Sequence, residues 1–159
     1  MNRLSRFRLI ACLPALLLWG CAAKYVEPTG DKVALLAIEN GTTEPVTTAI
    51  YGDAGECRNR SVIPSIAPGE QGAFKVATGR DLALTVTMSR REIKYGTTLV
   101  FRPEAGHRYL ANLNMDAKAG EVLLSDITSL LAPKPVKATA REWIRASGDA
   151  GPWCKPAGE

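Results

Sequence analysis

Hydrophobic and polar residues alternate along most of the chain beyond residue 30. The segment LALTVTM at 82–88 places leucine, valine and methionine on one face, with alanine and threonine on the other. The segment YLANLNM at 109–115 alternates in the same way. This period of two is typical of strands with one buried face, and turn-forming groups separate such segments at the short spacing of antiparallel sheets. We therefore expect about eight strands, near 33–39, 45–51, 61–66, 72–77, 82–89, 97–102, 108–115 and 121–127.

The pattern changes after Thr128. APKP at 132–135 predicts an extended spacer. Thr139 and Glu142 then have the spacing of a capping box, which predicts a short helix near 140–147. Trp143 would dock this helix on the strands, and a ligand contact is the less favoured interpretation of that residue. The predicted fold is all-β, an antiparallel β-sandwich of about 7–8 strands with a short C-terminal helix.

The first twenty residues have the layout of a secretory signal. Three arginines precede an uncharged apolar run that begins at Leu9. A helix of about twelve residues is only about 18 Å long, whereas the hydrocarbon core of a membrane is about 30 Å thick. The run is therefore too short for a permanent span, and we expect the segment to be removed.

Cys21 follows this run directly. The residues Leu18 to Cys21, LWGC, resemble the lipobox of bacterial lipoproteins, in which the cysteine thiol receives a diacylglyceryl group before cleavage just ahead of it. Trp19 departs from that pattern, which usually has a small or β-branched residue there. The alternative is an ordinary secretory signal that is cut near Ala22 or Ala23.

The lipobox resemblance implies three segments. These are a signal peptide at 1–20, a lipidated tether at 21–31, and one domain at 32–159 that includes the C-terminal tail. It also implies a protein held on the membrane by lipid on Cys21. Ala22 and Ala23 lack the aspartate that commonly retains lipoproteins in the inner membrane, so we expect the periplasmic face of the outer membrane.

The cysteine count predicts a disulfide. Cys12 would leave with the signal and Cys21 would carry lipid, so Cys57 and Cys154 remain in an oxidising compartment with one intramolecular pairing open to them. Such a bond would close a long loop and stabilise the fold by about 4–5 kcal/mol on chain-entropy grounds. A metal-binding or nucleophilic thiolate is less favoured, because neither cysteine has a second cysteine or a histidine at ligand spacing.

The charge of the chain does not indicate a nucleic-acid partner. The formal net charge is +4, and removal of the signal lowers it by three, because that segment holds three arginines and no acidic residue. The segment SRREIK at 89–94 carries cations that could meet lipid phosphates, although a solvated face is the favoured interpretation.

Few residues suggest catalysis. His107 is the only histidine and stands between Gly106 and Arg108 at the start of a strand, where a solvated turn residue is expected and a catalytic role is not. Asp53 and Glu56 supply two carboxylates, too few for a calcium site. The sequence has no phosphate-binding glycine loop or dinucleotide motif. We expect no catalytic residue, no metal and no cofactor.

A further resemblance rests on four segments: IAPGEQGAFKVATG, LALTVTM, LVFRPEAGHRY and EVLLSDIT. They are similar to a loosely defined group of uncharacterised small bacterial lipoproteins, with Phe101, Gly106, Tyr109 and Asp126 at the shared positions. The resemblance implies an immunoglobulin-like or transthyretin-like β-sandwich and no particular reaction. Phe101 and Tyr109 are expected to be cross-strand partners in the core.

Two functions fit these observations. The first is a lipid-anchored cell-envelope protein whose periplasm-facing domain has an interaction or structural role, offering a sheet edge or loop tips to an envelope protein partner. The second is a binding module or small enzyme that acts on envelope lipid, glycan or peptidoglycan. The lack of an evident nucleophile and base favours the first. A polar pocket with convergent carboxylates would favour the second.

Overall fold

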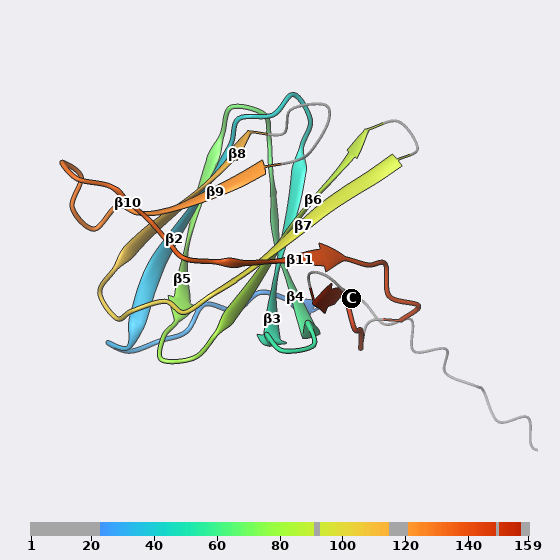
Figure 1. The fold of residues 1–159 in the computed structure, drawn as a ribbon, viewed down its shortest axis with the longest axis horizontal. Coiled ribbons are helices and arrows are strands. Elements are labelled where there is room, and N and C mark those ends of the chain that lie inside the picture. The colour runs from blue at the N-terminus through green and yellow to red at the C-terminus, as the bar shows by residue number, and fades with distance from the viewer. Residues whose placement is uncertain (1–22, 91–92, 115–120, 149, 157–159) are drawn as a thin grey trace, which may run out of the picture.

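The computed structural model describes residues 23–90, 93–114, 121–148 and 150–156, and these form two β-sheets with no helix among them (Figure 1). The all-β prediction is confirmed. The larger sheet has seven strands and the smaller sheet five. In spatial order the larger sheet contains β1 (Ala23–Lys24), β4 (Arg58–Ile66), β3 (Val46–Asp53), β6 (Leu82–Arg90), β7 (Ile93–Phe101), β11 (Thr139–Trp143) and β12 (Cys154–Pro156). The smaller sheet contains β10 (Lys134–Pro135), β9 (Glu121–Asp126), β8 (Arg108–Asn114), β2 (Val33–Asn40) and β5 (Gln71–Ala77).

Each of the eight strands expected from the alternation is present, as β2 to β9. The purely antiparallel arrangement is wrong, because β2 runs parallel to β8 and β1 runs parallel to β4. The cause of the first parallel pair is the path of the chain. It crosses from β2 to β3 and β4 in the larger sheet, returns to the smaller sheet as β5 on one side of β2, crosses again for β6 and β7, and comes back as β8 on the other side of β2.

The main core lies between the two sheets. Leu36 and Ile38 of β2 are fully buried, and so are Ile63 of β4 and Leu84 of β6, so the apolar faces of both sheets meet in a sandwich-like packing. This is the buried face that the alternation predicted.

Phe101 and Tyr109 are in contact, but not as the neighbours within one sheet that we expected. Their ring centroids are 5.3 Å apart in an edge-on arrangement. Because β7 and β8 belong to different sheets, the two rings meet across the core. Within their own sheets, Phe101 lies opposite Leu82 and Tyr109 lies opposite Asp126.

The C-terminal helix predicted near 140–147 is absent, and Thr139–Trp143 instead forms β11 at the edge of β7. An isolated helix of two turns is marginal in water, because nucleation fixes several residues for one hydrogen bond. At the open edge of β7 the backbone of this segment pairs with another strand instead, with Thr139 opposite Val100 and Glu142 opposite Thr97. The capping-box spacing was therefore overridden by tertiary pairing.

The segment after β11, residues 144–148 and 150–156, folds back over the outer face of the larger sheet, and we call it the tail. Cys57 and Cys154 form a disulfide with their Cα atoms 5.6 Å apart, so the predicted pairing is confirmed. A second, smaller core surrounds this bond and includes Tyr51 and Ala83 of the sheet together with Trp153 of the tail. The disulfide thus joins the tail to the turn between β3 and β4.

The described chain enters the larger sheet at its first residue. Ala23 of β1 pairs with Ser61 of β4, and the Tyr25 hydroxyl donates a hydrogen bond to the carbonyl of Lys75 at 2.8 Å. Part of the segment expected to be a tether is therefore integrated in the fold. The predicted signal at 1–20 and the predicted lipid site at Cys21 lie outside the described residues. Within the described ranges, no helix is long and apolar enough to cross a membrane.

Candidate functional site

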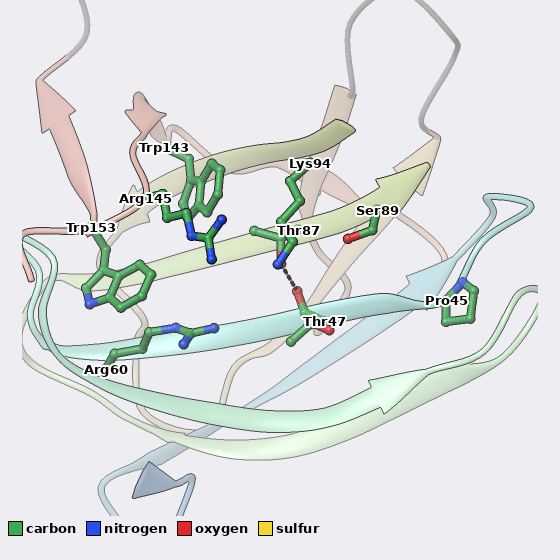
Figure 2. Close-up of a pocket in the computed structure, with 9 residues that line it drawn as sticks. All are labelled: Pro45, Thr47, Arg60, Thr87, Ser89, Lys94, Trp143, Arg145 and Trp153. Atoms are coloured by element: carbon green, nitrogen blue, oxygen red, sulfur yellow. Dashed lines mark hydrogen bonds between the residues drawn. The ribbon is translucent and has the colours of Figure 1, made fainter. Parts of the chain in front are cut away.

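A cleft of about 290 Å³ opens on the outer face of the larger sheet, beside the docked tail (Figure 2). We call it the outer cleft. Its walls come from strands in the middle of the sheet and from the tail, which are far apart in the sequence. Nine residues line it: Pro45, Thr47, Arg60, Thr87, Ser89, Lys94, Trp143, Arg145 and Trp153.

The floor of the outer cleft is made of hydroxyl side chains. Thr47 of β3 and Thr87 of β6 are cross-strand partners, and the Thr87 hydroxyl donates a hydrogen bond to the Thr47 carbonyl at 3.2 Å. Ser89 is the next residue of β6 on the same face. Because side chains alternate across a strand, Val86 and Met88, the residues on either side of Thr87, point into the core.

Two tryptophans form the aromatic walls. The indole of Trp143 lies against β7 at Gly96, where an added Cβ would come within 2.7 Å of the ring. Trp153 is 9% exposed, and its backbone N–H donates to the carbonyl of Cys57 at 3.2 Å. Gly96 and the disulfide-linked turn therefore fix the positions of the two indoles.

Three cations extend into the same space. They come from separate elements: Arg60 from β4, Lys94 from β7, and Arg145 from the tail after β11. In Figure 2 all three side chains reach toward the region between the tryptophans and the threonine floor. The guanidinium carbon of Arg60 lies 4.5 Å from the centroid of the Trp153 ring, a cation–π contact that orients it.

The lining of the outer cleft has one sign of charge. None of the nine described residues that line it is an aspartate, glutamate, histidine or cysteine. Three positive groups on low-dielectric aromatic walls focus a positive potential. The cleft is suited to an anion, and its described lining holds no carboxylate or imidazole for general acid–base chemistry.

A second cluster surrounds His107 at the turn between β7 and β8. His107 Nδ1 lies 2.7 Å from Asp126 Oδ2, and its Nε2 lies 3.5 Å from Glu104 Oε2. Asp126 also accepts a hydrogen bond from the Thr128 amide at 2.8 Å. Hydrogen bonding from Thr128, with a smaller contribution from His107, lowers the pKa of Asp126 to about 2, although burial opposes this shift.

The carboxylate nearest to His107 comes from a residue 19 positions away in the sequence, a connection that the sequence alone did not reveal. Asp126 lies directly opposite Tyr109 in the β8–β9 pairing, and this brings it beside His107. The register of that hairpin is the signal that could have revealed the pair. No described hydroxyl or thiol bonds to the imidazole, so the cluster has a base and a carboxylate but no adjacent nucleophile.

Replacing Asp126 with asparagine is expected to weaken the dependence of the free energy of unfolding on pH between about pH 4 and 2. The pKa of Asp126 is lower in the folded chain than in the unfolded chain, so its contribution is present above about pH 4 and is lost as pH falls toward 2. Urea unfolding from pH 7 to 2 should show Asp126→Asn less stable by about 1 kcal/mol at pH 7, with the difference vanishing near pH 2.

The matched control for that series is Asp81→Asn. Asp81 forms an exposed ion pair with Arg102 at 2.9 Å, and exposed pairs contribute little. An Asp126→Asn protein whose stability parallels the wild type at every pH would contradict this role of the carboxylate.

The remaining predicted positions have structural roles. Asp53 accepts backbone hydrogen bonds from Gly55 at 2.8 Å and Glu56 at 3.4 Å, as a turn residue does. The described residues contain no group of three or more His, Cys, Asp or Glu that could hold a metal ion. The two ends of the mixed-charge segment 89–94 pair with each other: Ser89 of β6 lies opposite Lys94 of β7. Both residues line the outer cleft.

Comparisons of this chain with protein-family models and with curated proteins find no match. Its function is therefore inferred from the residues of the site.

Proposed function

We propose that this chain is a lipid-anchored protein of the bacterial cell envelope whose domain is a binding module for a small anionic ligand. The observation that carries the proposal is the convergence of Arg60, Lys94 and Arg145 between two indoles, with no acidic residue among the described residues of the lining. Cations brought together from three separate elements repel one another, and a bound anion would relieve that repulsion.

Binding fits the outer cleft better than catalysis does. The residues in its lining donate hydrogen bonds or carry positive charge, and none of the described lining residues is a carboxylate, imidazole or thiol that could act as a general base. The one imidazole of the chain is held by Asp126 at the β7–β8 turn and is not part of the cleft. We therefore keep the proposal to recognition, with no bond made or broken.

The anchor would place the cleft close to the membrane. Cys21 is two residues ahead of Ala23, and a chain spans at most about 3.6 Å per residue, so the Cα atom that carries the lipidated side chain would lie within about 7 Å of β1. Lys24 of β1 and Thr47 of the cleft floor line a common shallow depression. The cleft would then face ligands at the membrane surface, on the periplasmic side of the outer membrane.

Metabolic labelling tests the anchor. A palmitate analogue should label the wild-type protein and leave Cys21→Ser unlabelled, because the thiol is the acceptor. Equal labelling of both proteins would contradict lipidation at Cys21.

Tryptophan fluorescence tests the binding function directly. Once residues 1–20 are removed, Trp143 and Trp153 are the two remaining tryptophans, and both line the outer cleft. Titration with millimolar phosphate, citrate, glucuronate and glucose 6-phosphate should give saturable changes in emission. Arg145→Ala should weaken binding about tenfold, the usual effect of removing one charged hydrogen-bond donor.

Arg102→Ala is the matched control, since Arg102 is exposed, pairs with Asp81 and lies outside the cleft. It should bind like the wild type. No change in emission with any anion of the panel, or equal weakening by both substitutions, would contradict the proposal.

A second candidate function is contact with an envelope protein through the loop between β9 and β10. Leu130 and Leu131 in this loop are 69% and 99% exposed, and Figure 1 shows the loop extending away from the two sheets. A Leu131→Ser protein that binds anions normally but fails in the cell would favour this role.

A further inference from the structure

We infer that the ligand of the outer cleft is a monosaccharide that carries a phosphate monoester. This inference rests on the proposed function and names the chemical class of the anion. It follows from three features of the cleft: the number and type of its cations, its aromatic walls with their hydroxyl floor, and its size.

The cations match a phosphate monoester better than a carboxylate. A phosphate monoester carries about 1.5 to 2 negative charges near pH 7 and has three terminal acceptor oxygens. A carboxylate has one charge and two oxygens, and it would leave one of Arg60, Lys94 and Arg145 without a partner. Arginine presents a planar pair of donors that fits two phosphate oxygens, and lysine binds phosphate as a point charge.

The geometry of Arg60 is already suited to this role. Its guanidinium lies over the Trp153 ring at 4.5 Å, so a bound phosphate would not have to order a freely moving side chain. Trp153 is itself fixed by its backbone hydrogen bond to Cys57 and by the neighbouring disulfide. The disulfide therefore also holds one wall of the phosphate position.

The other residues of the cleft suit a sugar ring. The indole of Trp143 gives a flat apolar surface for the C–H face of a pyranose. Hydroxyl side chains from Thr47, Thr87 and Ser89 form the floor, where sugar hydroxyls can exchange hydrogen bonds. An aromatic wall beside a hydroxyl floor is a mixture that inorganic phosphate alone would not use.

The volume of the cleft suits a ligand whose bound part is a single ring. Its volume of about 290 Å³ lies just below the usual range for ligand pockets, about 300–1,000 Å³. A phosphorylated monosaccharide could be free in solution or could be the headgroup of a lipid. Both sources present the same phosphate and the same ring to the cleft.

Isothermal titration of the mature protein tests this inference with four ligands: glucose 6-phosphate, glucuronate, glucose and inorganic phosphate. We expect glucose 6-phosphate to bind at least tenfold more tightly than glucuronate and more tightly than inorganic phosphate, with no heat from glucose. Trp143→Leu keeps an apolar side chain at β11 but removes the flat ring. It should reduce the advantage of glucose 6-phosphate over inorganic phosphate without weakening phosphate itself.

A vesicle measurement distinguishes the two sources. Vesicles that contain a glycolipid with a phosphorylated sugar are compared with vesicles of the same glycolipid without phosphate. Retention on the first kind alone supports a membrane source, and binding of the soluble sugar phosphate without retention on vesicles supports a free ligand.

Two outcomes would overturn the inference in distinguishable ways. Glucuronate binding as tightly as glucose 6-phosphate would refute the phosphate class while leaving an anion-binding cleft in place. Absence of binding by these three anions and by citrate would refute the inference together with the proposed function.

Discussion

Replacing Cys57 and Cys154 together by alanine is expected to lower the free energy of unfolding by about 4 kcal/mol and to abolish anion binding at the outer cleft. The bond joins residues 97 positions apart, so without it the unfolded chain gains the entropy of a long open loop. The tail would also lose its covalent link to the β3–β4 turn. Arg145 and Trp153 lie in this tail, so the cleft would lose one aromatic wall, one cation and the ring that orients Arg60.

Urea unfolding of the mature wild type and of the double variant measures the first effect, and fluorescence titration measures the second. Cys21→Ser is the matched control, because it removes a cysteine outside the disulfide. A double variant that still binds the anion, and whose free energy of unfolding is less than about 1 kcal/mol below that of the wild type, would show that the tail docks without the disulfide.

Gly96→Ala is expected to destabilise the protein by about 2 kcal/mol and to weaken ligand binding at least tenfold. An added Cβ would come within 2.7 Å of two atoms of the Trp143 ring, and overpacking of this kind usually costs about 1–3 kcal/mol. The indole would have to move away from β7. Because this ring is one aromatic wall of the cleft, the ligand would lose that contact.

The chain offers a matched control in Gly148. A Cβ at Gly148 would meet nothing within 4 Å, so Gly148→Ala should leave both stability and binding unchanged. Thermal unfolding followed by fluorescence titration of the two variants makes the comparison. If Gly96→Ala behaves like Gly148→Ala, Trp143 does not lie against β7 as described.

The core strands could be predicted because their signal is local. A strand with one buried face shows alternation within its own residues, and β6 and β8 display it plainly. The parallel pairing of β2 with β8 is not visible in either strand, because it depends on the route of the chain between the sheets. The helix expected near 140–147 failed for a similar reason, since the open edge of β7 outweighed the local capping signal.

The disulfide could be predicted and the outer cleft could not. After Cys12 and Cys21 are assigned elsewhere, a count leaves one pairing for Cys57 and Cys154, and no knowledge of the fold is needed. The cleft depends on three cations that stand far apart in the sequence, at positions 60, 94 and 145. The sequence alone placed Lys94 in a mixed-charge segment at a solvated strand end. Only the docked tail, which covers part of the outer face of the larger sheet, makes Lys94 part of a cleft.

Two-dimensional NMR of the mature wild-type protein, titrated with glucose 6-phosphate, tests the central claim most directly. The claim is that the outer cleft, assembled by the docked tail, is the ligand site. We predict saturable shifts of the indole N–H signals of Trp143 and Trp153 and of the side-chain Nε–H signals of Arg60 and Arg145, with the His107 ring unchanged. Shifts confined to His107 and its neighbours, or absent from both indoles at saturation, would contradict the account.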